Sequence, residues 1–200
     1  MVSKIAQHGV CVMDHFLPPA TIVELADEVI SLSVISKMQV AGTGRTHKTI
    51  NKDLRGDSIY WLNEAEATSA QQVYFAHMET LRQQLNQDLY LGLFALESHL
   101  ALYTAGTGYK KHIDRFKGSD TTQPQRQISC ILYLNQDWQD SNGGHLRLYL
   151  NPKTETPEPL HLDISPVAGR FVMFLSDTFY HEVLPATQDR MSLTAWFLTR

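Results

Sequence analysis

From residue 91 onward the sequence is a nearly unbroken series of short apolar segments separated by turns. These segments are SHLALYT, GYKKHID, QISCILYLN, GGHLRLYL, LHLDISP, RFVMFLS, HEVLPA and RMSLTAWFL. They are rich in β-branched and aromatic residues and follow one another at the short intervals typical of strands joined by turns. Because helical segments come first and the strands follow, the order predicts an α+β domain with a closed or sandwiched sheet.

Two segments in the first half of the sequence predict helices. Residues 17–32 place two prolines in the expected first turn, and residues 63–91 form a longer amphipathic segment. The apolar residues at helical spacing are Ile22, Leu25, Val29 and Ile30 in the first, and Val73, Phe75, Met78, Leu81 and Leu85 in the second. Residues 9–16 and 58–62 have strand character.

The length of 200 residues suits one hydrophobic core of ordinary size. Hydrophobic residues make up 43% of the chain and charged residues 19%, as in a typical globular protein. We therefore expect a single domain over residues 1–200, with helical and loop support in 1–90 and a catalytic β core in 91–200.

Charge and cysteine content exclude several classes of protein. The formal net charge of -4 offers no basic surface for nucleic acid. Two cysteines, Cys11 and Cys130, make no disulfide framework, which favours a reducing compartment. No apolar run is long enough for a signal peptide or a membrane span. We expect a cytoplasmic protein without a nucleic-acid or membrane partner.

Two short motifs far apart in the sequence carry the residues of a metal site. His112 and Asp114 lie two positions apart, so in an extended segment both side chains point to the same face. His181 would come from another strand that folds back alongside. Two histidines and one carboxylate are the ligand set of the facial triad that holds non-haem Fe(II) and leaves positions open.

A second His-x-Asp pair, His161 and Asp163, competes with the first. It follows a proline-rich stretch and precedes His181 by only twenty residues. Too few residues remain between them for the strands that a barrel needs between its first and last metal ligands. We therefore interpret His161 as a histidine of a surface loop or a strand edge.

Arg190 opens the last predicted strand, nine residues after His181. Strand alternation predicts one face with Arg190, Ser192, Thr194 and Trp196, and the other with Met191, Leu193, Ala195 and Phe197. The same rule puts Ser129, Ile131 and Tyr133 together on one face of an earlier strand. A guanidinium on such a strand could anchor a dicarboxylate, because it donates two parallel hydrogen bonds. This predicts an iron oxygenase that uses 2-oxoglutarate.

Longer motifs carry a resemblance to a known family. The motifs are GVCVMDHFLP, LRGDSIYWL, YTAGTGYKKHID, ISCILYLNQDW, GGHLRLYL, DISPVAGRFVMFLSD, HEVLPA and RMSLTAWF. With them the chain resembles the prolyl hydroxylase branch of the 2-oxoglutarate/Fe(II) oxygenases. The similarity is greatest to the hypoxia-inducible-factor prolyl hydroxylases and their bacterial relatives. The resemblance implies a double-stranded β-helix (jelly roll) with supporting N-terminal helices.

The resemblance also implies roles for individual residues. Iron would be held by His112, Asp114 and His181. The co-substrate 2-oxoglutarate would contact Arg190, Tyr133, Tyr103, Thr194 and Trp196, with the first two on its far carboxylate. The substrate would meet Arg126, Arg55 and Asp57. From the residues alone, Tyr133 could instead be a core aromatic, Trp196 a packing residue, and Arg55 with Asp57 a structural pair.

The implied activity is hydroxylation of a prolyl residue in a protein, with Fe(II), O₂ and 2-oxoglutarate, giving succinate and CO₂. Ascorbate would support activity, and the substrate would be a proline-containing protein such as a translation or regulatory protein. Three alternatives remain open: an oxygenase of a small molecule or free amino acid, a nucleic-acid demethylase, and a non-enzymatic metal-binding jelly roll. The demethylase is disfavoured because the second arginine expected six residues after Arg190 is replaced by Trp196.

The segment 43–57 is polar and glycine-bearing, and long loops in compact domains are often functional. We expect it to close over a protein substrate, as lids do in many enzymes.

Overall fold

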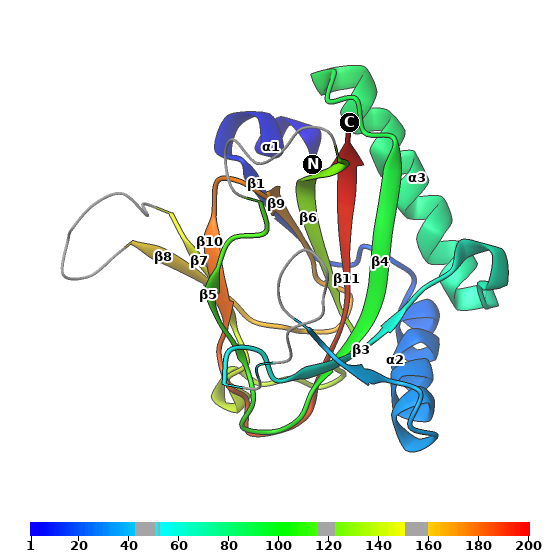
Figure 1. Ribbon diagram of the computed structural model, residues 1–200, viewed down its shortest axis with the longest axis vertical. Coiled ribbons are helices and arrows are strands. Elements are labelled where there is room, and N and C mark those ends of the chain that lie inside the picture. The colour runs from blue at the N-terminus through cyan, green and yellow to red at the C-terminus, as the bar shows by residue number, and fades with distance from the viewer. Residues whose placement is uncertain (43–50, 52, 116–122, 151–159) are drawn as a thin grey trace.

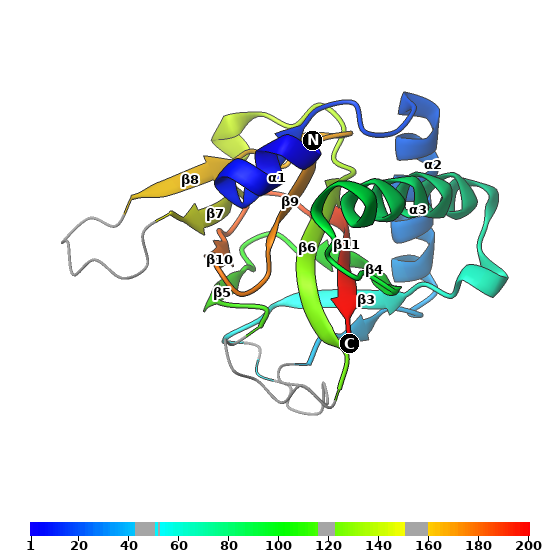
Figure 2. The same cartoon turned by 90° about the horizontal axis from the view of Figure 1, so that it is seen from above.

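Two antiparallel β-sheets face one another in the computed structural model, which describes residues 1–42, 51, 53–115, 123–150 and 160–200 (Figures 1 and 2). The larger sheet contains β1 (Val10–Met13), β2 (Gln39–Val40), β3 (Asp57–Trp61), β4 (Ala95–Tyr103), β6 (Gln125–Tyr133), β9 (Phe171–Leu175) and β11 (Arg190–Thr199). The smaller sheet contains β5 (Tyr109–His112), β7 (Leu146–Tyr149), β8 (His161–Ile164) and β10 (Tyr180–Val183).

The strand order shows how distant parts of the chain come together. The larger sheet has the order β1-β9-β6-β11-β4-β3-β2 and the smaller one β5-β10-β7-β8. The C-terminal strand β11 pairs with β4 on one side and β6 on the other, so it occupies the middle of the larger sheet. Every segment that the sequence predicts as a strand contains one, and the two packed sheets agree with the predicted α+β architecture.

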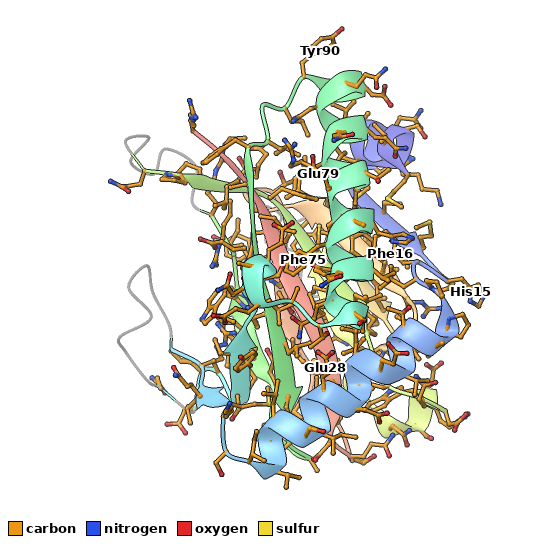
Figure 3. All side chains as sticks on the ribbon, turned by 90° about the vertical axis from the view of Figure 1, so that its right-hand side faces the viewer. His15, Phe16, Glu28, Phe75, Glu79 and Tyr90 are labelled. Atoms are coloured by element: carbon orange, nitrogen blue, oxygen red, sulfur yellow. The ribbon has the colours of Figure 1, made fainter. Side chains whose placement is uncertain are left out.

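Three helices cover one face of the larger sheet: α1 (Val2–His8), α2 (Pro19–Val34) and α3 (Ser69–Leu89). Figure 3 looks onto α2 and α3 from outside, with the sheet behind them. Thr68 caps α3 by accepting a hydrogen bond from the Gln71 amide, and Glu28 of α2 accepts hydrogen bonds from both side chains. These polar contacts join the two helices at the start of α3.

The main hydrophobic core lies between these helices and the larger sheet. It includes Leu25 and Met78 from the helices together with Leu193, Ala195 and Phe197 from β11. The predicted alternation of β11 is therefore confirmed on its apolar face. The opposite face of the sheet turns toward the smaller sheet. Part of it forms a second hydrophobic cluster, in which Ile131 and Val172 pack with Leu148, and polar residues of the same face, Arg190, Ser192 and Thr194, line a pocket.

The register of two helices differs from the prediction. In α3 the buried residue is Tyr74, which is 1% exposed, whereas its neighbours Val73 and Phe75 are only partly buried. Tyr74 can be buried because its hydroxyl lies 3.2 Å from the Ser98 hydroxyl, so its polar end has a partner. In α2 the predicted apolar residue Ile30 is 51% exposed, since the stripe that packs on the sheet ends at Val29.

Helix α1 and the two-residue strand β2 were not predicted. Within the described residues, no helix is long and apolar enough to span a membrane. The predicted substrate lid, 43–57, lies largely outside the described residues, because 43–50 and 52 are not among them.

Candidate metal centre

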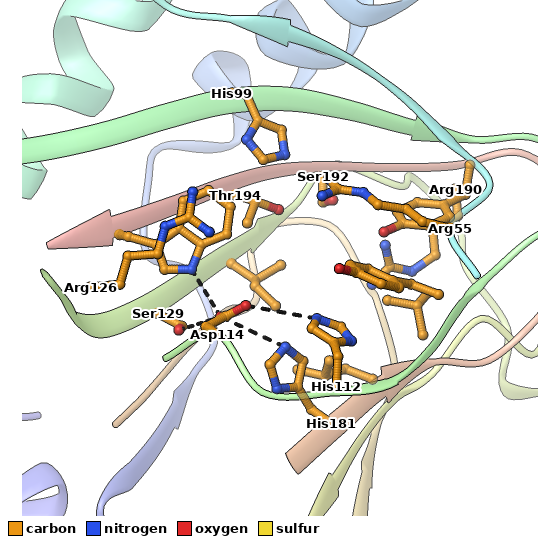
Figure 4. A pocket seen from close by; sticks show the side chains of 16 residues that line it. Arg55, His99, His112, Asp114, Arg126, Ser129, His181, Arg190, Ser192 and Thr194 are labelled. Atoms are coloured by element: carbon orange, nitrogen blue, oxygen red, sulfur yellow. Dashed lines mark hydrogen bonds and ion pairs between the residues drawn. The ribbon is translucent and has the colours of Figure 1, made fainter. Parts of the chain in front are cut away.

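Two histidines and an aspartate converge in the space between the two sheets (Figure 4). His112 ends β5 and lies directly opposite His181 of β10 in the sheet, with the ring centroids 4.1 Å apart. Asp114 approaches both rings, at 3.7 Å from the Nε2 atom of each. One ligand atom from each of the three residues lies within 4.8 Å of the others, which is compact enough for one metal ion.

The chain reaches this geometry in a different way from the one predicted. Strand β5 ends at His112, and Asp114 lies in a bend beyond it. The alternation of an extended strand therefore does not orient the carboxylate. Its side chain points to the same place as His112 because contacts from the larger sheet hold it there.

Each histidine is held by a backbone carbonyl near it in sequence. The Nδ1 atom of His112 lies 2.8 Å from the Lys110 carbonyl, and that of His181 lies 3.1 Å from the Phe179 carbonyl. Since a carbonyl can only accept, each ring carries its proton on Nδ1 and leaves Nε2 available to a metal.

The protonation states of these groups suit a metal. Burial and the nearby His181 together lower the pKa of His112 to about 3, so the imidazole is neutral. Burial raises the pKa of Asp114, but the two histidines and hydrogen bonds from Ser129 and Trp196 outweigh it and hold that pKa well below its usual range. Neutral imidazole and ionised carboxylate are the forms that bind metal, and this donor set fits non-haem Fe(II).

Beside this cluster lie two buried donors whose hydrogen bonds are incomplete. Arg190 is 1% exposed and donates from Nε to the Gly144 carbonyl at 2.8 Å, but its Nη2 atom has no partner among the described residues. The buried hydroxyl of Tyr133 likewise has none there. The Arg190 guanidinium lies 5.0 Å from the Tyr133 ring centroid. Burial raises the pKa of Tyr133, although Arg190 opposes the shift, so the phenol keeps its proton.

Unpaired buried donors are costly, so they indicate a group that this pocket is built to receive. A guanidinium nitrogen and a phenol together suit a carboxylate, which only accepts hydrogen bonds. A dicarboxylate that reaches from Arg190 to the metal cluster therefore fits the donors present, and 2-oxoglutarate is such a molecule.

Most of the other predicted site residues line the same pocket: Tyr103, Thr194, Trp196, Arg126 and Arg55. Arg190 and Ser192 of β11 line it as well, so the predicted polar face of this strand is confirmed. Asp57 is not exposed to the pocket, because it is buried behind Arg55 at 1% exposure. The roles of all these residues toward co-substrate and substrate stay predictions.

His99 is a pocket residue that sequence reasoning missed. It lies on β4 opposite Thr194 and packs edge-on against Trp61, with 4.9 Å between the ring centroids. Its position four residues before Tyr103 on the same strand was the available signal, because residues two or four apart share a face. The competing histidine, His161, is exposed on the edge strand β8 of the smaller sheet, as predicted.

Arg55 and Asp57 form a buried two-pronged ion pair, with Nε to Oδ1 at 2.6 Å and Nη2 to Oδ2 at 2.9 Å. Burial alone lowers the pKa of Arg55, but the hydrogen bonds and the charge of Asp57 outweigh it and raise that pKa above its usual value. Arg147 and Asp163 make the same fork on the surface, at 2.8 and 2.7 Å. The two pairs differ chiefly in burial.

This contrast gives a stability prediction. Asp57→Asn should lower the free energy of unfolding by about 1.5–3 kcal/mol, because a buried charged donor loses an ionised acceptor. Asp163→Asn should cost less than about 1 kcal/mol, because solvent screens the exposed pair. Urea unfolding of both variants tests this. Equal losses in the two variants would contradict a structural role for the buried pair.

Comparison with known families agrees with this geometry. The model of the family described as "2OG-Fe(II) oxygenase superfamily" matches residues 98–198, which include every residue that lines the pocket except Arg55. The chain is 31% identical over 199 residues to Egl nine homolog 1 from Homo sapiens, covering 96% of this chain and 44% of that protein. It is 28% identical over 212 residues to a hypoxia-inducible factor prolyl hydroxylase from Caenorhabditis elegans, covering 100% of this chain and 28% of that protein. The chain spans about half the length of the human, rat and mouse Egl nine homologues.

Two solved structures are similar over nearly the whole chain. A prolyl-4-hydroxylase from Pseudomonas putida is 38% identical with a TM-score of 0.86, covering 98% of this chain and 96% of that one. A prolyl hydroxylase from Trichoplax adhaerens, in complex with a hypoxia-inducible factor peptide, is 26% identical with a TM-score of 0.85, covering 98% and 86%. These similarities confirm the predicted double-stranded β-helix and the predicted resemblance.

Proposed function

Since the chain belongs to the 2OG-Fe(II) oxygenase superfamily, we propose that it hydroxylates a prolyl residue of a protein, using O₂ and 2-oxoglutarate. The family confirms the expected cofactor and co-substrates, Fe(II), 2-oxoglutarate and O₂. The observation that carries the proposal is one pocket lined both by the His-Asp-His cluster and by Arg190, whose buried Nη2 atom has no partner among the described residues. Tyr133 does not line this pocket, but its ring centroid lies 5.0 Å from the Arg190 guanidinium and its buried hydroxyl also has no hydrogen-bond partner there.

The proposal gives each group of pocket residues one role. His112, Asp114 and His181 would hold Fe(II), and Arg190 with Tyr133 would bind the far carboxylate of 2-oxoglutarate. When bound, Fe(II) lets O₂ and 2-oxoglutarate oxidise an unactivated C–H bond, so that 2-oxoglutarate, O₂ and substrate give succinate, CO₂ and an alcohol. Arg190 is buried, so water screens the attraction between its guanidinium and the carboxylate only weakly.

The prolyl substrate is proposed from the relatives. The two similar structures described above are prolyl hydroxylases, and one of them was solved with a peptide. Arg126 and Arg55 line the pocket and are the proposed contacts of the substrate, with Asp57 holding Arg55 in place. One domain over 1–200, a cytoplasmic location, support by ascorbate, and a translation or regulatory protein as substrate stay predictions.

The direct test is substrate-dependent consumption of 2-oxoglutarate. The purified chain is given Fe(II), 2-oxoglutarate and O₂, with a set of proline-containing proteins, a panel of free amino acids and metabolites, or methylated nucleic acid. We expect succinate formation to rise only with a protein, and one added oxygen atom to map to proline. Turnover with a metabolite alone would favour a small-molecule oxygenase, and binding of the metal without any succinate would favour a non-enzymatic module.

Tyr133→Phe gives a quantitative prediction about the co-substrate. This change removes one hydrogen bond to a charged acceptor, which is worth about 1.5–3 kcal/mol. Since about 1.4 kcal/mol is tenfold in affinity, the Kd of 2-oxoglutarate should rise by about ten- to a hundredfold. An anaerobic titration of the Fe(II)-loaded protein measures it.

Tyr149→Phe is the matched control, because the Tyr149 hydroxyl bonds to Glu182 rather than to a pocket residue. It should leave the Kd of 2-oxoglutarate unchanged. If Tyr133→Phe also left that Kd unchanged, Tyr133 would be a core aromatic and not a ligand of the co-substrate.

A further inference from the structure

Asp114 is oriented by the larger sheet, although it follows a strand of the smaller one. The indole N–H of Trp196, on β11, donates to its Oδ2 atom at 2.9 Å. The hydroxyl of Ser129, on β6, donates to the same oxygen at 2.6 Å. Dashed lines in Figure 4 mark the hydrogen bonds and ion pairs of Asp114, which lies there beside Ser129 and faces the two histidines.

Each donor is itself held in place. The Arg126 guanidinium lies 3.5 Å from the Trp196 ring centroid, and Glu97 pairs with that guanidinium at 3.2 Å. On the other side, the Ser129 hydroxyl lies 2.9 Å from that of Ser176, which is fully buried. Because Ser129 gives its proton to the carboxylate, Ser176 is the donor in that second contact. The Trp196 indole, stacked on Arg126, and the Ser129 hydroxyl, which is hydrogen-bonded to Ser176, therefore both donate to Oδ2 of Asp114.

The two carboxylate oxygens of Asp114 differ in consequence. Oδ2 accepts two hydrogen bonds, which engages both of its lone pairs. Oδ1 accepts none from the described residues. Each oxygen lies 3.7 Å from the Nε2 atom of one histidine, Oδ1 from that of His112 and Oδ2 from that of His181, so the two differ in their hydrogen bonds and not in their distance to the cluster. Because the lone pairs of Oδ2 are engaged by Ser129 and Trp196, Oδ1 is the oxygen whose lone pairs are available to a metal.

We infer that Trp196 and Ser129 are positioning residues that make Asp114 offer a single oxygen, Oδ1, to the metal. The inference rests on the proposed metal centre. A carboxylate that contributes one ligand atom, with one from each histidine, leaves the remaining positions of the ion to co-substrate and O₂. Trp196 thereby acts on the carboxylate rather than on 2-oxoglutarate, and Arg126 keeps its ring plane in place.

The test is metal affinity rather than turnover. Mn(II) is titrated into the metal-free chain of residues 1–200, without 2-oxoglutarate, and free Mn(II) is measured by electron paramagnetic resonance. Trp196→Phe and Ser129→Ala should each raise the Kd of Mn(II) by about ten- to a hundredfold, as is usual for groups that orient a metal ligand. Ser129→Thr keeps the hydroxyl and should bind almost as the wild type does.

Two control variants remove the same chemical groups elsewhere. Trp61→Phe removes an indole N–H from a ring beside the pocket that does not bond to Asp114, and Ser98→Ala removes a buried hydroxyl that bonds to Tyr74. Both should leave the Kd of Mn(II) unchanged. The double variant Trp196→Phe/Ser129→Ala should deviate from additivity, because both donors act on one oxygen.

The Mn(II) titrations distinguish failure of the positioning roles of Trp196 and Ser129 from failure of the metal centre itself. Circular dichroism first checks that Trp196→Phe and Ser129→Ala are folded. If the wild type binds Mn(II) and both folded variants bind it equally well, Trp196 and Ser129 are packing residues. The inference then fails, while the metal centre stands. If the wild type does not bind Mn(II), the metal centre fails and the inference with it. Should Trp196→Phe not fold, the comparison of Ser129→Ala with Ser129→Thr decides alone.

Discussion

Replacing His112, Asp114 or His181 by alanine is expected to abolish consumption of 2-oxoglutarate. Each of these residues supplies one of three ligand atoms that lie within 4.8 Å of one another. Loss of one leaves two protein ligands for an ion that needs three to be held in an open facial arrangement. The measurement is succinate formation together with bound iron per chain after reconstitution with Fe(II).

The second His-x-Asp pair supplies the matched control. His161→Ala and Asp163→Ala should retain iron and turnover, since both residues lie on the edge strand β8 and Asp163 pairs with Arg147. Loss of iron in His161→Ala, with His112→Ala still active, would overturn the assignment of the metal centre.

Arg190→Ala is expected to weaken 2-oxoglutarate by about a hundredfold or more. Removing one partner of a buried charged pair typically costs about 3–5 kcal/mol, and about 1.4 kcal/mol is tenfold in Kd. Arg190 is 1% exposed and its Nη2 atom has no partner among the described residues, so a bound carboxylate would supply the missing hydrogen-bond acceptor and the opposite charge. The measurement is an anaerobic titration of 2-oxoglutarate against the Fe(II)-loaded variant.

Iron should stay bound in Arg190→Ala, because Arg190 is not one of the three clustered residues. Arg147→Ala is the control, since this arginine pairs with Asp163 on the surface and should not affect 2-oxoglutarate. An unchanged Kd in Arg190→Ala would mean that another cation of the pocket, Arg126 or Arg55, holds the co-substrate.

Strand periodicity made much of this fold predictable. In β11 the apolar residues Leu193, Ala195 and Phe197 entered the core under the helices, and Arg190 and Thr194 lined the pocket, as a period of two requires. The helices were less certain in register. The run Val73-Tyr74-Phe75 offers three adjacent hydrophobic residues, and local spacing cannot tell which of them the sheet buries.

Short elements escaped prediction because they carry too little pattern. Helix α1 has seven residues and buries only Ile5, so its sequence has no repeat to read. Such a segment is helical because tertiary contacts with β1, β9 and α3 stabilise it.

The sequence predicted which three residues would cluster as candidate metal ligands, but it did not predict the side chains that hold them in place. The residue types and spacing of His112, Asp114 and His181 indicate a non-haem iron site even before the fold is known. The hydrogen bond from Trp196 to Asp114 depends instead on the register of β11 and on a bend after β5, which no local pattern encodes. For this reason the sequence placed Trp196 beside the co-substrate or in packing, and the structure places its indole N–H on the carboxylate.

Hydroxylation of a prolyl residue in a protein can be measured in cells by mass spectrometry of their proteins under isotopically labelled O₂. Cells that contain the gene are compared with cells that lack it and with cells that carry His181→Ala. We expect at least one protein in which a proline gains a labelled oxygen atom only with the wild-type gene. Identical proline oxidation in all three, with 2-oxoglutarate consumed in the purified system by a small molecule instead, would contradict it.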